Sequence, residues 1–215
     1  MLNSNAMHGC LRILAIIAPI LATEGAARTA DEILASRIGV LTRAHDSRAL
    51  QRMEGSIVGS HSHRLKNMYF VGRHFADPPA DRDFVRDFPT DIESITDMYA
   101  LTPIVTGQHG TYAFDELARL AELGRSDAIV KLIEVVSRAD GAVGEFTADR
   151  LSVVARSRPS ITLRVLSKMP TSTLDRVMAN PLPWCDSAHK LEGVSSQNAR
   201  VRRLQARIHL SRLHC

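Results

Sequence analysis

Aromatic residues and lysine are scarce in this sequence. Its 215 residues include six phenylalanines, three tyrosines and one tryptophan, and four lysines stand beside 23 arginines. Domains that read nucleic acids combine basic surfaces with recognisable motifs and stacking aromatic side chains. No such motif is present, so we expect no sequence-specific binding of DNA or RNA.

Familiar catalytic motifs are also missing. The glycine-containing stretches GSIVGSHS (55–62) and TGQHGT (106–111) lack the lysine that a phosphate-binding loop requires. No serine stands in the Gly-x-Ser-x-Gly pattern of the α/β-hydrolases. The sequence therefore favours a binding protein without a cofactor over an enzyme. A catalytic triad assembled from distant residues stays open, because triads are defined by geometry.

The N-terminal apolar run is too short to cross a bilayer. It covers ten residues (13–22, ILAIIAPILA), whereas a spanning helix needs about 20. Arg12 precedes the run and small residues follow it, which is the order of a secretory signal peptide. Cleavage after Ala27 would put Gly25 and Ala27 at the two small-residue positions. We predict a signal peptide over 1–27 and export to the periplasm or the medium; a buried N-terminal helix is the alternative.

Cysteine is limited to three residues. Cys10 would leave with the signal peptide, so Cys185 and Cys215 would be the only thiols of the exported protein. An oxidising compartment favours a bridge between them, which would close a loop of about 30 residues and stabilise the fold by roughly 3 to 4 kcal/mol. Two unrelated thiols are the alternative.

Positive charge is concentrated at the C-terminus. The formal net charge is +4, and the last fifteen residues contain no acidic side chain. Helical spacing places Arg200, Arg203 and Arg207 on one face of a terminal helix and apolar residues on another. We expect the apolar face to pack on the protein and the arginines to lie beside the acidic stretch 77–97. Binding of phosphates or an anionic membrane surface is the alternative.

The remaining patterns predict an all-α protein. Part 28–111 is expected to be helical and rich in loops. It begins with one or two helices over 29–53, followed by a break over 54–63 and a strand or helical turn over 68–75. A helix over 90–100, capped by Thr90 or Asp91, then precedes a loop over 101–112. Part 112–180 shows five short amphipathic helices separated by short turns. Part 181–215 is expected to hold a polar linker, 186–199, before the basic helix. The fold is an irregular bundle or a short stack of antiparallel helical hairpins.

Three histidines raise one competing hypothesis. In an extended segment His61 and His63 would project the same way, and with His74 they could bind zinc in a metal-dependent hydrolase. We favour instead an exported, non-enzymatic protein that binds a protein or peptide partner, as an adaptor, an inhibitor or a host-directed secreted factor, because stacked helices offer grooves for such partners. The oligomeric state is left open.

Overall fold

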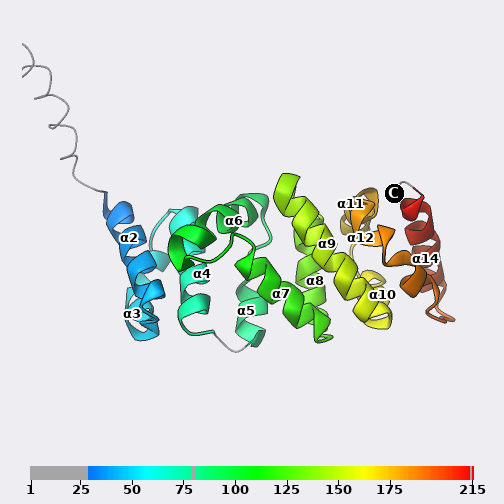
Figure 1. Cartoon of the computed structure of the whole chain (residues 1–215), viewed down its shortest axis with the longest axis horizontal. Coiled ribbons are helices and arrows are strands. Elements are labelled where there is room, and N and C mark those ends of the chain that lie inside the picture. Colours follow the sequence, from blue (N-terminus) through cyan, green and yellow to red (C-terminus); the bar gives the residue numbers. More distant parts are fainter. Residues whose placement is uncertain (1–28, 79–80, 214) are drawn as a thin grey trace, which may run out of the picture.

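The computed structural model describes residues 29–78, 81–213 and 215. In these residues it contains thirteen helices and no strand, which confirms the predicted all-α class. The predicted signal peptide lies outside the described residues. Figure 1 shows the helices following one another along the long axis, with α2 at one end and α14 at the other.

The first five helices form the N-terminal part. They are α2 (Ala30–Arg43), α3 (Ser47–Val58), α4 (His63–Ala76), α5 (Asp81–Asp87) and α6 (Ile92–Thr106). Thr29 and Glu32 form a capping box at the start of α2, which satisfies two backbone N–H groups that have no partner inside the helix. Asp91, one of the two caps that the sequence predicted, caps α6 by accepting a hydrogen bond from the Ser94 N–H.

Residues 68–75 are helical, within α4, which is the second of the two alternatives predicted for them. Two other predictions for this part were wrong, each because tertiary burial outweighed a local signal. The helix α3 continues past Gly55 to Val58, since Ile57 is buried in the core. The segment 101–106 is the end of α6 rather than a loop, because burial of Leu101 and Val105 compensates for the backbone hydrogen bond that Pro103 cannot donate.

Alternate helices of the N-terminal part run parallel. Along α2 and α4 the neighbours are Asp31 with Ser60, just before α4, and then Thr42 with Gly72. Along α4 and α6 they are Asn67 with Asp97, and then Gly72 with Val105. Residue numbers rise together in both pairs of helices, so α2, α4 and α6 point the same way. This is the arrangement of stacked helical hairpins.

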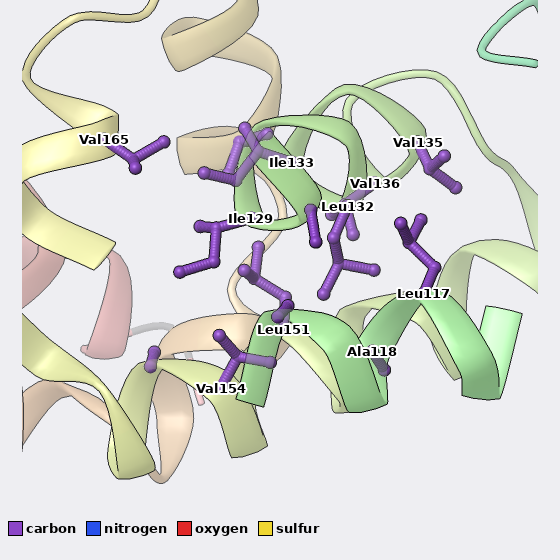
Figure 2. Close-up of a cluster of buried hydrophobic side chains, with 14 of the residues drawn as sticks. Leu117, Ala118, Ile129, Leu132, Ile133, Val135, Val136, Leu151, Val154 and Val165 are labelled. Atoms are coloured by element: carbon purple, nitrogen blue, oxygen red, sulfur yellow. The ribbon is translucent and has the colours of Figure 1, made fainter. Parts of the chain in front are cut away.

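The middle of the chain forms the main core. The five predicted helices of 112–180 are present as α7 (Tyr112–Glu122), α8 (Ser126–Val136), α9 (Gly141–Ser157), α10 (Pro159–Leu166) and α11 (Thr171–Ala179). Figure 2 shows Leu132 and Ile133 of α8 among side chains of α7, α9 and α10. Gly124, with φ of +89°, turns the chain between α7 and α8 where other residues would be strained.

The C-terminal part is more helical than predicted. The expected polar linker contains α13 (Ala188–Glu192), preceded by α12 (Leu182–Cys185) and followed by α14 (Ala199–Arg212). The linker prediction failed because two apolar side chains anchor these short helices. Trp184 is fully buried and donates its indole N–H to the Val177 carbonyl at 3.2 Å, and Leu191 is fully buried in the same core.

Candidate partner-binding groove

The three histidines of the metal hypothesis do not come together. Ser62 caps α4 with its hydroxyl, so His63 begins a helix and is not part of an extended segment with His61. His74 lies eleven residues further along α4, about 16 Å away along the helix axis. Within the described part of the chain, no group of three histidine, cysteine or acidic side chains has a metal-binding arrangement. The geometry gives no support to a metal-dependent hydrolase at these residues.

His74 is a buried side chain of the core. Its ring stacks on Phe84 with a centroid distance of 3.9 Å. Burial disfavours the charged imidazolium and lowers the pKa of His74 to about 4, although the carboxylates of Glu116 and Asp81 act in the opposite direction. His74 is therefore an uncharged imidazole at neutral pH.

The basic terminal helix packs on the protein through the predicted apolar face. Val201, Leu204 and Ile208 of α14 are buried. The predicted position beside the acidic stretch 77–97 was wrong, because α14 lies at one end of the molecule whereas α5, within that stretch, lies nearer the middle (Figure 1). The carboxylate that meets Arg207, at 2.8 Å, belongs to Asp175 of α11.

The arginines of this helix are partly used within the chain. The Arg200 guanidinium donates to the Met169 carbonyl at 3.0 Å, and Arg207 is paired with Asp175, whereas Arg203 is exposed. Two of the three candidate anion-binding residues thus help to attach α14 to the turn after α10 and to α11. Internal hydrogen bonding accounts for them without an external phosphate or membrane.

A disulfide also fastens the terminal helix. The structure joins Cys185 of α12 to Cys215 across 30 residues of sequence, with their Cα atoms 5.7 Å apart. This agrees with the predicted pairing. The bridge ties the chain just beyond α14 to the short helix that carries the buried Trp184.

A groove in the N-terminal part has the features of a binding surface. It has a volume of about 550 Å³ and is formed by α2, the start of α4 and the end of α6. Leu65, Met68 and Leu101 form its apolar floor and are almost fully buried. Ile104, which is 56 % exposed, stands at its edge. An apolar side chain of a binding partner would move from water onto a surface that is already largely formed.

Small residues on α2 make the groove. Ala35, Ser36 and Gly39 line it at positions where longer side chains would fill it. A Cβ atom at Gly39 would lie 3.3 Å from a guanidinium nitrogen of Arg43. The same guanidinium crosses to α6 and donates to the Ile104 carbonyl at 2.9 Å. Gly39 therefore leaves room for a bond that ties α2 to α6 at one end of the groove.

Opposite charges mark the two ends of the groove wall on α2. Asp31 lies in the first turn and Arg43 in the last, about 18 Å apart along the helix. Glu32 is engaged in the capping box, whereas Asp31 has one long hydrogen bond, 3.5 Å from the Ser60 hydroxyl. The Asp31 carboxylate and most N–H groups of Arg43 thus stay available to a bound segment.

Sequence reasoning missed this groove for two reasons. The prediction of a loop over 101–112 removed the helix that forms one wall. The helix predicted within 29–53 also came with no indication of a hollowed face. Ala35, Ser36 and Gly39, which line the groove, are small residues that share one face of α2, and that pattern was the available signal.

Among the described residues, no helix has the length and apolar character needed to cross a membrane. Comparison of the chain with protein-family models, with curated proteins and with solved structures found no match.

Proposed function

We propose that this chain is an exported, non-enzymatic protein that binds a segment of a protein partner in the groove formed by α2, α4 and α6. The observation that carries the proposal is the groove itself. It joins a buried apolar floor to the exposed side chain of Ile104, while the exposed Ile33 and Val40 lie on the same helix α2 without lining it. A concave, mostly apolar surface with a few polar groups is typical of binding sites.

The shape and charge of the groove favour an amphipathic helix as the bound segment. Parallel helices α2 and α6 present ridges between which a further helix can pack. The distance of about 18 Å from Asp31 to Arg43 matches about twelve residues, or three helical turns. Apolar side chains on one face would meet Leu65, Met68 and Leu101. A basic residue would lie near Asp31 and an acidic one near Arg43.

Filling the groove tests this proposal. Ala35→Trp places a large side chain on the wall of the groove, and Val58→Trp adds the same side chain at an exposed position that does not line it. Affinity capture from the native compartment would compare the wild-type protein with both variants. We expect one partner to be retained by the wild type and by Val58→Trp and lost by Ala35→Trp.

Calorimetry with the helix of that partner would then measure the effect directly. We expect at least a tenfold loss of affinity for Ala35→Trp and less than a twofold change for Val58→Trp. Equal binding by the two variants, or recovery of the bait alone under all conditions, would reject the groove as the binding site.

Export has a separate test. Intact mass of the protein recovered from outside the cytoplasm is expected to show loss of residues 1–27 and of the two hydrogens released when Cys185 and Cys215 form their bridge. Protein that retains the N-terminal residues, or that carries free thiols, would argue against export through a cleaved signal peptide.

A further inference from the structure

The outer face of α14, at the C-terminal end of the molecule, combines apolar and basic side chains. Val201, Leu204 and Ile208 are buried, so the opposite face of the helix meets solvent. Residues 203, 206, 210 and 213 follow helical spacing along that outer face, and all four are exposed. They are Arg203, Ala206, Leu210 and Leu213.

Two leucines on the outer face are more exposed than buried. Leu210 is 60 % exposed and Leu213 is 69 % exposed. Leu210 also borders a hollow of about 310 Å³ between α11 and α14, where Met178 and Ala179 extend the apolar surface. The two leucines lie three residues apart and are neighbours on one face of the helix, so a single flat surface can contact both.

Three arginines of α14 are also exposed. Among the described residues, no carboxylate pairs with Arg202, Arg203 or Arg212. Arg202 donates one N–H to the Gln197 carbonyl at 3.1 Å, which leaves its positive charge without a counter-charge. Of the three arginines that the sequence offered as candidates for binding anions, Arg203 alone belongs to this set.

The acidic groups beside α14 do not neutralise these arginines. Asp175 lies 2.8 Å from Arg207, and Glu192 lies 3.1 Å from Nδ1 of His209, so both carboxylates already have partners on the helix. The helix itself contains five arginines and no acidic residue. The surface around the two leucines therefore carries a net positive charge.

The exposed apolar residues of α2 have a different electrostatic setting. There Ile33 and Val40 are exposed on a helix whose two acidic and two basic side chains cancel. Apolar side chains beside excess positive charge are the combination that binds the surface of an anionic bilayer. A soluble polyanion would contact the arginines and leave the leucines in water.

The place of α14 in the fold leaves its outer face open to a flat surface. The helix lies at one end of the long axis (Figure 1), and its inner face is buried against the protein. The disulfide between Cys185 and Cys215 holds the chain just beyond Leu213. The helix can therefore contact a bilayer while its inner face stays packed.

We infer that the outer face of α14 attaches the protein to the surface of an anionic lipid membrane. Leu210 and Leu213 enter the boundary between headgroups and acyl chains. Arg202, Arg203 and Arg212 contact lipid phosphates. The attachment is peripheral and reversible, because two leucines bury little apolar surface. It shares no residue with the groove, so the proposed partner binding can fail while this inference holds.

Vesicles that differ in charge test the inference. The expected exported form, residues 28–215, contains all the described helices and lacks the apolar run 13–22, which could bind lipid by itself. Flotation compares vesicles of phosphatidylcholine alone with vesicles in which about a third of the lipid is phosphatidylglycerol. At about 0.1 M salt we expect about tenfold stronger binding to the anionic vesicles, and most of it should be lost at about 0.5 M salt.

Two double variants separate the apolar contribution from the electrostatic one. Leu210→Ser with Leu213→Ser keeps the charge and is expected to weaken binding to anionic vesicles about tenfold, while binding to heparin, a soluble polyanion, stays within about twofold. Arg203→Gln with Arg212→Gln is expected to weaken binding to both about tenfold. Circular dichroism checks the fold, which should be intact because all four side chains are exposed.

A matched pair of exposed apolar residues on α2 supplies the control. Ile33→Ser with Val40→Ser removes similar side chains at the other end of the molecule and should leave vesicle binding unchanged. Equal binding to neutral and anionic vesicles, no binding to either, full binding by the leucine variant, or binding to heparin alone would overturn the inference.

Discussion

The N-terminal part, α2 to α6, and the C-terminal part, α7 to α14, are built from similar short helices but bury them differently. In the C-terminal part, α8 is enclosed by α7, α9 and α10, and Ile129, Leu132 and Ile133 are fully buried. In the N-terminal part a smaller separate cluster around Leu50 and Met68 fills the space between α2, α3, α4 and α6. Among the described residues, α2 stands at one end of the stack and packs against α3, α4 and α6 (Figure 1).

This difference bears on which part we expect to stabilise the fold and which part we expect to bind a partner. A stack of helices needs polar outer faces at its ends if those ends are to meet only water. The C-terminal end is fastened by the disulfide to Cys185 and carries the strongly basic α14, but it also exposes Leu210 and Leu213. The N-terminal end exposes Ile33 and Val40 and also holds the groove, which α2 lines. The groove, rather than exposed apolar residues alone, is therefore the reason that we expect a partner at the N-terminal end.

The largest effect is expected from truncating the enclosed core. Leu132→Ala removes a fully buried side chain of α8 and should lower the free energy of unfolding by about 3 to 5 kcal/mol. Leu65→Ala removes a side chain that also lines the groove, so the surroundings can relax more easily; about 2 kcal/mol is expected. Urea denaturation measures both.

Hydrogen exchange sharpens this first comparison. With Leu65→Ala, faster exchange should be confined to α2, α3 and α4, whereas Leu132→Ala should accelerate exchange in helices of both parts. Equal losses of stability with the same pattern of exchange would show that the two parts unfold as one unit and that the comparison is mistaken.

An intermediate effect is expected from acid, through His74 of the N-terminal part. Its pKa is about 4 in the folded protein and about 6.5 when unfolded, so the unfolded chain binds the proton more readily between these values. The contribution of His74 to stability is fully present above pH 6.5 and is lost as pH falls toward 4. At pH 4.5 the loss is about 2 to 3 kcal/mol relative to pH 7.5.

The His74→Phe variant isolates this contribution. Protonation of carboxylates with lowered pKa, such as Asp87 and Asp127, also destabilises the folded protein in acid, but it does so equally in the variant and in the wild type. The difference in unfolding free energy between the variant and the wild type should therefore grow in favour of the variant below pH 6.5. Parallel pH profiles for the two proteins would contradict the burial of a neutral imidazole.

Two helical glycines of the N-terminal part should respond to substitution with opposite signs, and Gly55 should give the smallest effect of all. A Cβ atom at Gly55 would meet nothing within 4 Å, so Gly55→Ala is expected to stabilise the protein by about 0.5 to 1 kcal/mol. A Cβ atom at Gly72 would collide with the Thr42 hydroxyl and crowd Ile38, so Gly72→Ala should cost about 1 to 3 kcal/mol. Thermal unfolding distinguishes them, and stabilisation by Gly72→Ala would show that α2 and α4 are not closely packed.

Prediction from sequence succeeded where the spacing of apolar residues and the positions of helix-ending residues agreed. The five helices from Tyr112 to Ala179 follow apolar spacing interrupted by Gly124, Asp140 and Pro159, and each was expected. Prediction failed at Gly55 and Pro103, where a local breaker stands inside a helix that buries Ile57 or Val105. A breaker costs about 1 to 3 kcal/mol, which burial of one or two apolar side chains can offset.

The sequence by itself determined the all-α class, the helices of the central part and the apolar face of α14, because these depend on spacing along one segment. It also limited the pairing of Cys185 with Cys215 once Cys10 was set aside. Only the tertiary structure decided that Arg207 meets Asp175, that the three histidines stay apart, and that Leu65, Leu101 and Ile104 border one groove. Such contacts join residues distant in sequence, and their positions depend on how the helices pack rather than on any local pattern.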